Sequence, residues 1–144
     1  MIFMNTELKL ALSVHETIIL LLEKKSIIEQ IGLCFGLISE EGTVRIDEFT
    51  EIENLDASSS SFSLDYTVLI KQITYHQQKG KNFLGLFHSH PLGKSLLPSK
   101  KDRHYMQYWP SPFVWLIGAF PQILAFEFSI NKVYQIPYTL FETK

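Results

Sequence analysis

The feature that most constrains this sequence is a short apolar segment that runs directly into two histidines and a proline. Residues 83–87 are apolar, which is typical of a buried β-strand, and His88-Ser-His90-Pro91 follows without a break. Successive strand residues point to opposite faces, so His88 and His90 share one face, with Cα atoms about 6–7 Å apart. Because Pro91 ends the strand, we expect the histidine pair at an end of the sheet, where open α/β sheets bind ligands.

The rest of the chain alternates between short apolar runs and helical patterns. Helices are expected over residues 13–28, beginning with a Ser13/Glu16 capping box, and over 65–79 and 100–109. Strands are expected at 32–39, 44–49, 83–87, 114–117, 123–128 and 132–136, with a weaker edge-strand candidate at 8–12. This order predicts an α/β domain with a mixed sheet and helices packed on it.

Composition limits the class of protein and its partners. The length of 144 residues and the 46% hydrophobic content predict one globular domain over residues 1–144. A net charge of −2 gives no electrostatic reason to expect a nucleic acid partner. The sequence shows neither a signal-peptide pattern nor an apolar run long enough for a membrane span, so we expect a cytoplasmic protein that does not bind membranes. The single cysteine, Cys34, fits a reducing compartment.

A third candidate metal ligand follows the histidines. In Ser99-Lys-Lys-Asp102, at the start of the expected third helix, the Asp102 carboxylate would join the two imidazoles. Two histidines and one carboxylate leave the fourth tetrahedral position of zinc open, as in catalytic zinc sites. Each motif also has a structural interpretation, because His-x-His occurs in strands without metal and Ser-x-x-Asp is a capping box. The two interpretations of Asp102 are compatible.

The joint pattern of apolar strand, His-Ser-His-Pro, short loop and Ser-x-x-Asp closely resembles the JAMM (MPN-plus, JAB domain) family of zinc isopeptidases. The family's upstream glutamate is matched by Glu29, which precedes the apolar strand with Gly32 and Gly36. Glu53-Asn54 and the strand after Trp109 agree as well, so the resemblance covers roughly residues 8–130. It implies a central curved β-sheet flanked by helices, similar to that of cytidine deaminases, in a stand-alone enzyme of the prokaryotic type.

The resemblance also implies a role for each site residue. His88, His90 and Asp102 match the zinc ligands, Glu29 matches the general acid/base, and Ser99 matches the serine whose hydroxyl stabilises the oxyanion. Glu29 also has a structural interpretation, as a solvated carboxylate at a helix end. Rival glutamates fall in a turn or on the second strand (Glu40, Glu41, Glu48 and Glu51). Other residues are expected to be structural: surface His15, His76 and His104, and core Cys34, Trp109 and Trp115.

The function implied by the resemblance is zinc-dependent hydrolysis of the bond after the C-terminal glycine of a ubiquitin-like or sulfur-carrier protein. The substrate's tail would lie extended in a groove and add to a sheet edge. Lys94, Lys100, Lys101 and Arg103 could meet an acidic partner surface. Two other functions stay open: a peptidase that trims a carrier protein in sulfur metabolism, and a non-catalytic scaffold of the same fold. A deaminase is disfavoured because the Pro-Cys-x-x-Cys ligand pair is absent.

Overall fold

The structure is a computed structural model that describes residues 6–143. Strands and helices follow one another in this order: β1 (Leu8–Ala11), α1 (Leu12–Glu23), β2 (Ile31–Ile38), β3 (Val44–Ile52), α2 (Tyr66–Gln78), β4 (Asn82–Ser89), α3 (Lys100–Met106), β5 (Val114–Ala119), β6 (Gln122–Ser129), β7 (Lys132–Ile136) and β8 (Tyr138–Phe141). Among the described residues, no helix has both the length and the apolar character needed to cross a membrane.

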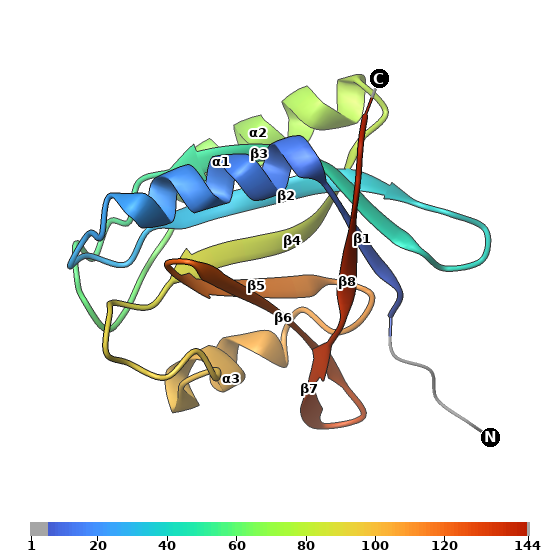
Figure 1. The fold of residues 1–144 in the computed structure, drawn as a ribbon. Coiled ribbons are helices and arrows are strands. Elements are labelled where there is room, and N and C mark those ends of the chain that lie inside the picture. The colour runs from blue at the N-terminus through green and yellow to red at the C-terminus, as the bar shows by residue number, and fades with distance from the viewer. Residues whose placement is uncertain (1–5, 144) are drawn as a thin grey trace.

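The strands form one mixed, curved sheet in the order β7-β6-β5-β4-β2-β3-β1-β8. Strand β4 pairs antiparallel with β2 and parallel with β5, so it lies inside the sheet. The two outermost strands, β7 and β8, are separated in the chain only by Pro137. A flat sheet could not bring its opposite edges so close, and Figure 1 shows it curling until β7 leads directly into β8. The predicted fold class is confirmed.

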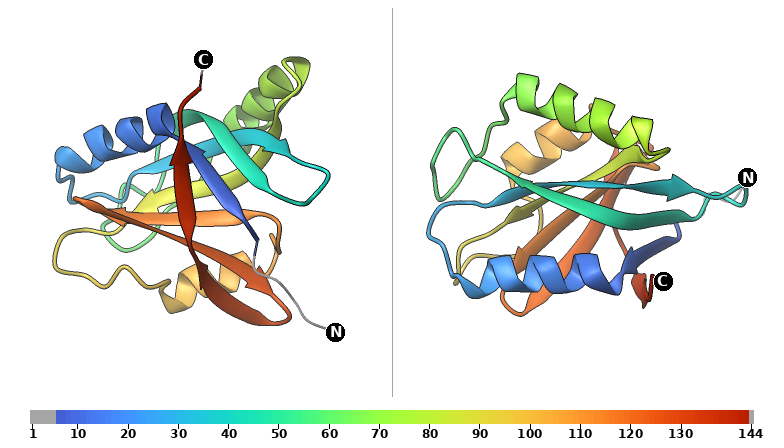
Figure 2. Two further views of the ribbon diagram at one scale, coloured as in Figure 1. Left: turned by 45° about the vertical axis from the view of Figure 1, so that its right-hand side comes forward. Right: turned by 90° about the horizontal axis from the view of Figure 1, so that it is seen from above.

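Helices cover both faces of this sheet, each over its own hydrophobic core. Helix α1 packs on one face through residues such as Ile18, whereas α2 and α3 pack on the other through Leu69 and Met106. The right-hand view of Figure 2 shows α1 on the opposite side of the strands from α2 and α3. Alternation along β4 places Phe87 in the α1 core and Leu86 in the α2–α3 core. His88 therefore faces α3.

The first helix differs from the sequence prediction at both ends. It begins at Leu12 with extended Ala11 as its N-cap and no side-chain cap, so the Ser13 capping box is wrong. The reason is that β1 runs into α1 without a loop, which puts Ser13 inside the first turn. The helix ends at Glu23 rather than near residue 28, and Lys25 has a positive φ of 49° that stops it.

Pairing between strands that are distant in sequence explains why some strand predictions were wrong. Strand β1 is not an edge strand, because β3 lies on one side of it and β8 on the other, both parallel to it. Strand β8 was not predicted. Near the candidate ligand Asp102, α3 ends at Met106, earlier than predicted, and Trp109 is 42% exposed rather than in the core. Cys34 and Trp115 are buried as predicted.

Candidate metal centre

The two histidines lie at the end of β4, held by both neighbouring strands. Ile31 of β2 is paired with His88, and the next residue, Ser89, donates its N–H to the carbonyl of Gln30 at 2.9 Å. On the other side, the N–H of His90 donates to the carbonyl of Gly118 at 2.8 Å. His88 is fully buried and His90 is nearly so. The backbone therefore fixes both imidazoles on the α3 side of the sheet.

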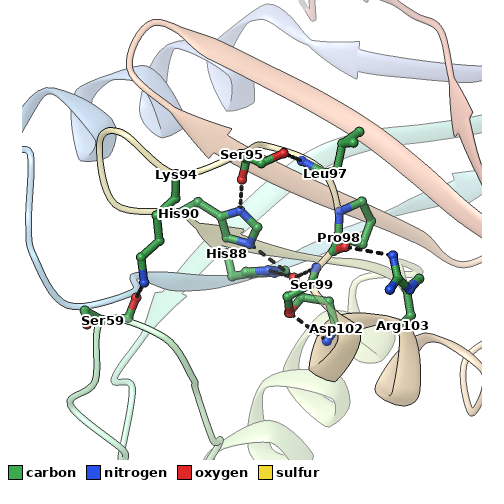
Figure 3. A network of polar contacts seen from close by, with 10 residues as sticks. All are labelled: Ser59, His88, His90, Lys94, Ser95, Leu97, Pro98, Ser99, Asp102 and Arg103. Atoms are coloured by element: carbon green, nitrogen blue, oxygen red, sulfur yellow. Dashed lines mark hydrogen bonds and ion pairs between the residues drawn. The ribbon is translucent and has the colours of Figure 1, made fainter.

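Asp102 reaches the histidines from the first turn of α3. Its Oδ2 atom lies 3.2 Å from Nε2 of His88 and 3.1 Å from Nε2 of His90. The same oxygen accepts the backbone N–H of Ser99 at 2.9 Å, while Oγ of Ser99 accepts the N–H of Asp102 at 3.0 Å. This is a complete capping box, and Figure 3 shows it beside the imidazoles. One carboxylate thus caps the helix and faces the histidine pair.

Hydrogen bonds set the orientation of the His90 ring. Its Nδ1 donates to the carbonyl of Ser95 at 2.6 Å, which leaves Nε2 directed at Asp102. Burial opposes protonation, but the bonds to Asp102 and Ser95 raise the pKa of His90. Nε2 of His90 donates a hydrogen bond to Asp102 only when the ring carries a second proton. A bound metal ion would replace that proton. A backbone carbonyl that fixes the other ring nitrogen is typical of metal-binding histidines.

Among the described residues, the ring of His88 has no hydrogen-bond partner. This absence makes the three residues fit a metal ion. Both of its ring nitrogens are buried without a hydrogen bond, although Nε2 lies close to Asp102. Burial lowers the pKa of His88, so the ring is neutral and offers a lone pair. The ligand atoms of His88, His90 and Asp102 all lie within 4.8 Å of one another. Two imidazoles and a carboxylate could therefore hold a metal ion, as sequence analysis predicts.

Glu29 lies in the segment that leads into β2, and only 5% of it is exposed. Its backbone N–H donates to the carbonyl of Ser58 at 2.8 Å, and its carbonyl accepts from Nδ2 of Asn54 at 3.0 Å. The Oε1 atom is buried without a partner. Burial, reinforced by the negative charge of Asp102, raises the pKa of Glu29 to about 7. A carboxyl group with a pKa near neutrality can both accept and return a proton.

The rival glutamates are engaged elsewhere or exposed. Glu48 pairs with Nδ1 of His76 at 2.6 Å and with Lys79 at 3.0 Å. His76 is buried and stacks on Phe35, with ring centroids 3.7 Å apart, so its predicted solvated position is wrong. The three other candidates are exposed on the β2–β3 turn or on β3 (Glu40, Glu41 and Glu51). His104 is exposed on α3, as predicted.

Two loops border the site and are joined by Lys94. The loop of residues 91–98 carries Lys94, whose Nζ donates to the carbonyl of Ser59 at 3.2 Å, in the loop of residues 54–63 (Figure 3). Asn54 organises this second loop by accepting the N–H groups of Asp56 and Ser63. Both loops are therefore braced by side chains: Lys94, which was expected only to meet a partner surface, and Asn54, to which no role was assigned. A polar residue two positions after the end of β3 was the available signal for Asn54.

A mixed α/β domain with a His-His-Asp group at the end of an interior strand is the class that these observations define. Residues 12–129 match the family described as prokaryotic homologs of the JAB domain. Because this match covers most of the chain, the protein belongs to that family, and its JAB/MPN domain class includes metal-dependent peptidases. The predicted family relationship is confirmed. No functionally curated protein matches the chain.

Solved structures show the same fold. A protein from Desulfitobacterium hafniense, solved in solution, is 23% identical with a TM-score of 0.80, and the match covers 94% of each chain. A JAB1/MPN domain protein from Archaeoglobus fulgidus is 17% identical with a TM-score of 0.61, over 93% of this chain and 99% of the other. A protein from Salinibacter ruber is 16% identical with a TM-score of 0.68, over 92% and 90%.

Proposed function

We propose that this protein is a zinc-dependent isopeptidase that hydrolyses the bond after the C-terminal glycine of a ubiquitin-like or sulfur-carrier protein. The observation that carries the proposal is the convergence of His88, His90 and Asp102 beside a buried Glu29 with a pKa near 7. Two imidazoles and one carboxylate are a ligand set of catalytic zinc, with one position left for water. The family's metal-dependent peptidases support the same reaction class.

The residues of this chain can perform both proton transfers of amide hydrolysis. Bound zinc would polarise the scissile carbonyl and lower the pKa of a water molecule. Glu29 accepts the proton as the water oxygen adds to the carbonyl carbon, and returns it to the nitrogen as the C–N bond breaks. The products are a carboxylate and an amine. No covalent bond to the protein is formed, which agrees with the burial of Cys34 in the core.

We expect Ser99 to assist the developing negative charge. Its Oγ already accepts the N–H of Asp102, so its own hydrogen remains available for donation. Ser99 is exposed, whereas the neighbouring Asp102 is buried. A donor directed at the oxyanion is among the largest contributions to acyl-transfer catalysis.

The substrate's tail would lie between the two loops over the site. Strand β4 has neighbours on both sides, and the edges of the described sheet are β7 and β8. Backbone partners at the metal would therefore come from residues 54–63 and 91–98. A glycine-terminated tail fits a narrow passage because glycine has no side chain. A cytoplasmic location is part of the proposal.

The test uses zinc-loaded protein and fusions in which a glycine-terminated modifier is joined either to a lysine side chain or to a linear peptide. We expect cleavage directly after the terminal glycine, abolished by a chelator and restored by zinc. Glu29→Gln should bind zinc but lose cleavage, whereas Glu51→Gln, an exposed control on β3, should cleave normally. Zinc binding without cleavage of any fusion would favour the scaffold. Preference for linear fusions would favour carrier trimming.

A further inference from the structure

Ser89 lies between the two histidines of β4 in sequence, but its side chain belongs to the opposite face of the sheet. Successive strand residues alternate in direction, so this side chain points away from the α3 side, where His88 and His90 converge. Ser89 is only 5% exposed and lines a small cavity together with Gln30 and Leu22 of α1. Ser89 is therefore not a metal ligand, and the proposed mechanism gives it no role.

The Ser89 hydroxyl makes a hydrogen bond that the backbone would normally make. Residues opposite each other in a hydrogen-bonded antiparallel pair exchange two N–H···O=C bonds. Gln30 and Ser89 continue the β2–β4 pairing one step beyond Ile31 and His88. The first bond is regular, from the N–H of Ser89 to the carbonyl of Gln30 at 2.9 Å. In the second, the N–H of Gln30 donates to Oγ of Ser89 at 2.7 Å, so a side chain extends the pairing.

These two bonds hold the residue next to Glu29. Strand β2 begins at Ile31, so Glu29 lies before the strand and its position depends on the contacts of its short segment. On one side, the backbone of Glu29 is bonded to the loop of residues 54–63. On the other side, Gln30 is bonded in both directions to Ser89. The bonds to Ser89 therefore tie the Glu29 segment directly to the strand that carries both histidines.

We propose that Ser89 is a positioning residue that sets the distance between Glu29 and a metal ion held by His88 and His90. This inference rests on the proposed function, in which Glu29 carries the proton of amide hydrolysis. Proton transfer requires the donor and the acceptor to lie within hydrogen-bond reach. A misplacement of about 1 Å can lower the rate of an enzyme about 100-fold. The hydroxyl accepts the Gln30 N–H, so a side chain without a hydroxyl cannot serve.

The chain offers a matched control on the other side of Glu29. Oγ of Ser26 accepts the N–H of Ile28 at 3.1 Å, as Oγ of Ser89 accepts that of Gln30. Ser26 and Ile28 both belong to the connection between α1 and β2, so their bond does not reach the histidine strand. Ser26→Ala therefore removes a similar hydrogen bond without affecting the link between the two segments. Ser89→Ala removes that link, and Ser89→Thr keeps the hydroxyl.

Cobalt(II) in place of zinc reports the position of Glu29 without any cleavage. A paramagnetic ion shifts nearby amide signals by an amount that depends steeply on their distance from it, and the zinc-loaded protein provides the reference. In ¹⁵N-labelled Ser89→Ala we expect altered cobalt-induced shifts for the Glu29 and Gln30 amides. The shift of Ile117, which is paired with His88 on β5, should stay as in wild type.

The other variants make this measurement decisive. Ser26→Ala and Ser89→Thr should leave all of these cobalt-induced shifts close to those of the wild type. If Ser89→Ala does not fold, Ser89→Cys replaces it, because the larger sulfur atom lengthens the bond to Gln30. Unchanged Glu29 and Gln30 shifts would overturn the proposal. Failure of the wild-type protein to bind cobalt or zinc would reject the metal site and this proposal together.

Cleavage measurements separate this inference from the proposed function. With saturating zinc, Ser89→Ala should lower kcat more than about tenfold while KM and zinc affinity stay close to wild type, and Ser89→Thr should restore kcat. Unchanged kcat, or an equal loss of zinc affinity, would reject Ser89 as a positioning residue and leave the proposed function standing. Altered cobalt shifts in Ser89→Ala, with no cleavage of any fusion by the wild-type protein, would reject the proposed function instead.

Discussion

The side-chain amide of Asn54 donates to the backbone carbonyl of Glu29, with 3.0 Å between the two atoms. Asn54 is buried, and the same amide group also donates to the carbonyl of Ser61. Its Oδ1 accepts two backbone N–H groups within the loop of residues 54–63. One side chain therefore positions the candidate general base and the loop that covers it.

Replacing this asparagine should uncouple metal binding from catalysis. Asn54→Ala leaves the Glu29 carbonyl and three loop groups without a partner, at a cost of about 1–3 kcal/mol in the free energy of unfolding. Cleavage should fall more than tenfold while zinc affinity stays nearly unchanged. Gln77→Ala, which removes an exposed amide on α2, is the control. Equal losses of zinc and activity would show that Asn54 supports the metal ligands instead.

Asp102 takes part in the capping box of α3 and is also a candidate metal ligand. Two substitutions separate these roles. Asp102→Asn keeps an oxygen that can accept the Ser99 N–H, whereas Asp102→Ala does not. Zinc at about 100 times its Kd should stabilise the wild-type protein by about 2.7 kcal/mol. Both variants should lose most of this gain, and only the alanine should lose about 0.5–2 kcal/mol more from the broken cap. Thermal unfolding with and without zinc measures both effects; full zinc stabilisation of either variant would remove Asp102 from the ligands.

Ser99 is expected to contribute to both helix capping and the rate of cleavage. Ser99→Ala should destabilise the protein by about 0.5–2 kcal/mol and lower kcat by about 10²–10³-fold. Ser99→Thr keeps a hydroxyl and should retain most of the stability and most of kcat. Denaturant unfolding gives the stability, and steady-state kinetics give kcat. A stability loss with kcat unaffected would restrict Ser99 to the cap.

The pKa of Glu29 predicts how the stability of the metal-free protein depends on pH. Because this pKa rises from 4.5 to about 7 on folding, the folded state holds the extra proton between these values. The free energy of unfolding therefore falls as pH rises through this window, by about 3 kcal/mol at most. Glu29→Gln should remove this part of the decrease. Urea unfolding at pH 5 and pH 7.5 compares the two proteins, and identical pH dependence would contradict the buried, protonated state.

Local patterns were sufficient to predict the parts of the site that lie close together in sequence. The alternation of β4 predicted that His88 and His90 share a face, and Ser99-x-x-Asp102 predicted a capped helix beside them. Placing Glu29 just before the neighbouring strand, β2, needed the family resemblance. The register of β2 and β4 explains it, because Ile31 is paired with His88. The metal itself and the chemical roles of these residues remain predictions.

The features that the sequence did not predict depend on contacts between distant segments. His76 looked like a surface residue on α2, but it packs on Phe35 and pairs with Glu48 of β3. A role for Asn54 could not be predicted, because its hydrogen bond to Glu29 joins two segments that are distant in sequence. Strand β8 is short and follows Pro137, so its local pattern was too weak to identify. Only its pairing with β1 makes it a strand.

That pairing has a consequence for how the chain is synthesised. Because β1 needs β8 along one side, β1 must wait until residues 138–141 have been synthesised before its hydrogen bonding is complete. During translation, the β1 side facing β8 would be open to pairing with other chains. A nascent chain would thus remain open to aggregation along β1 until residues 138–141 have joined it.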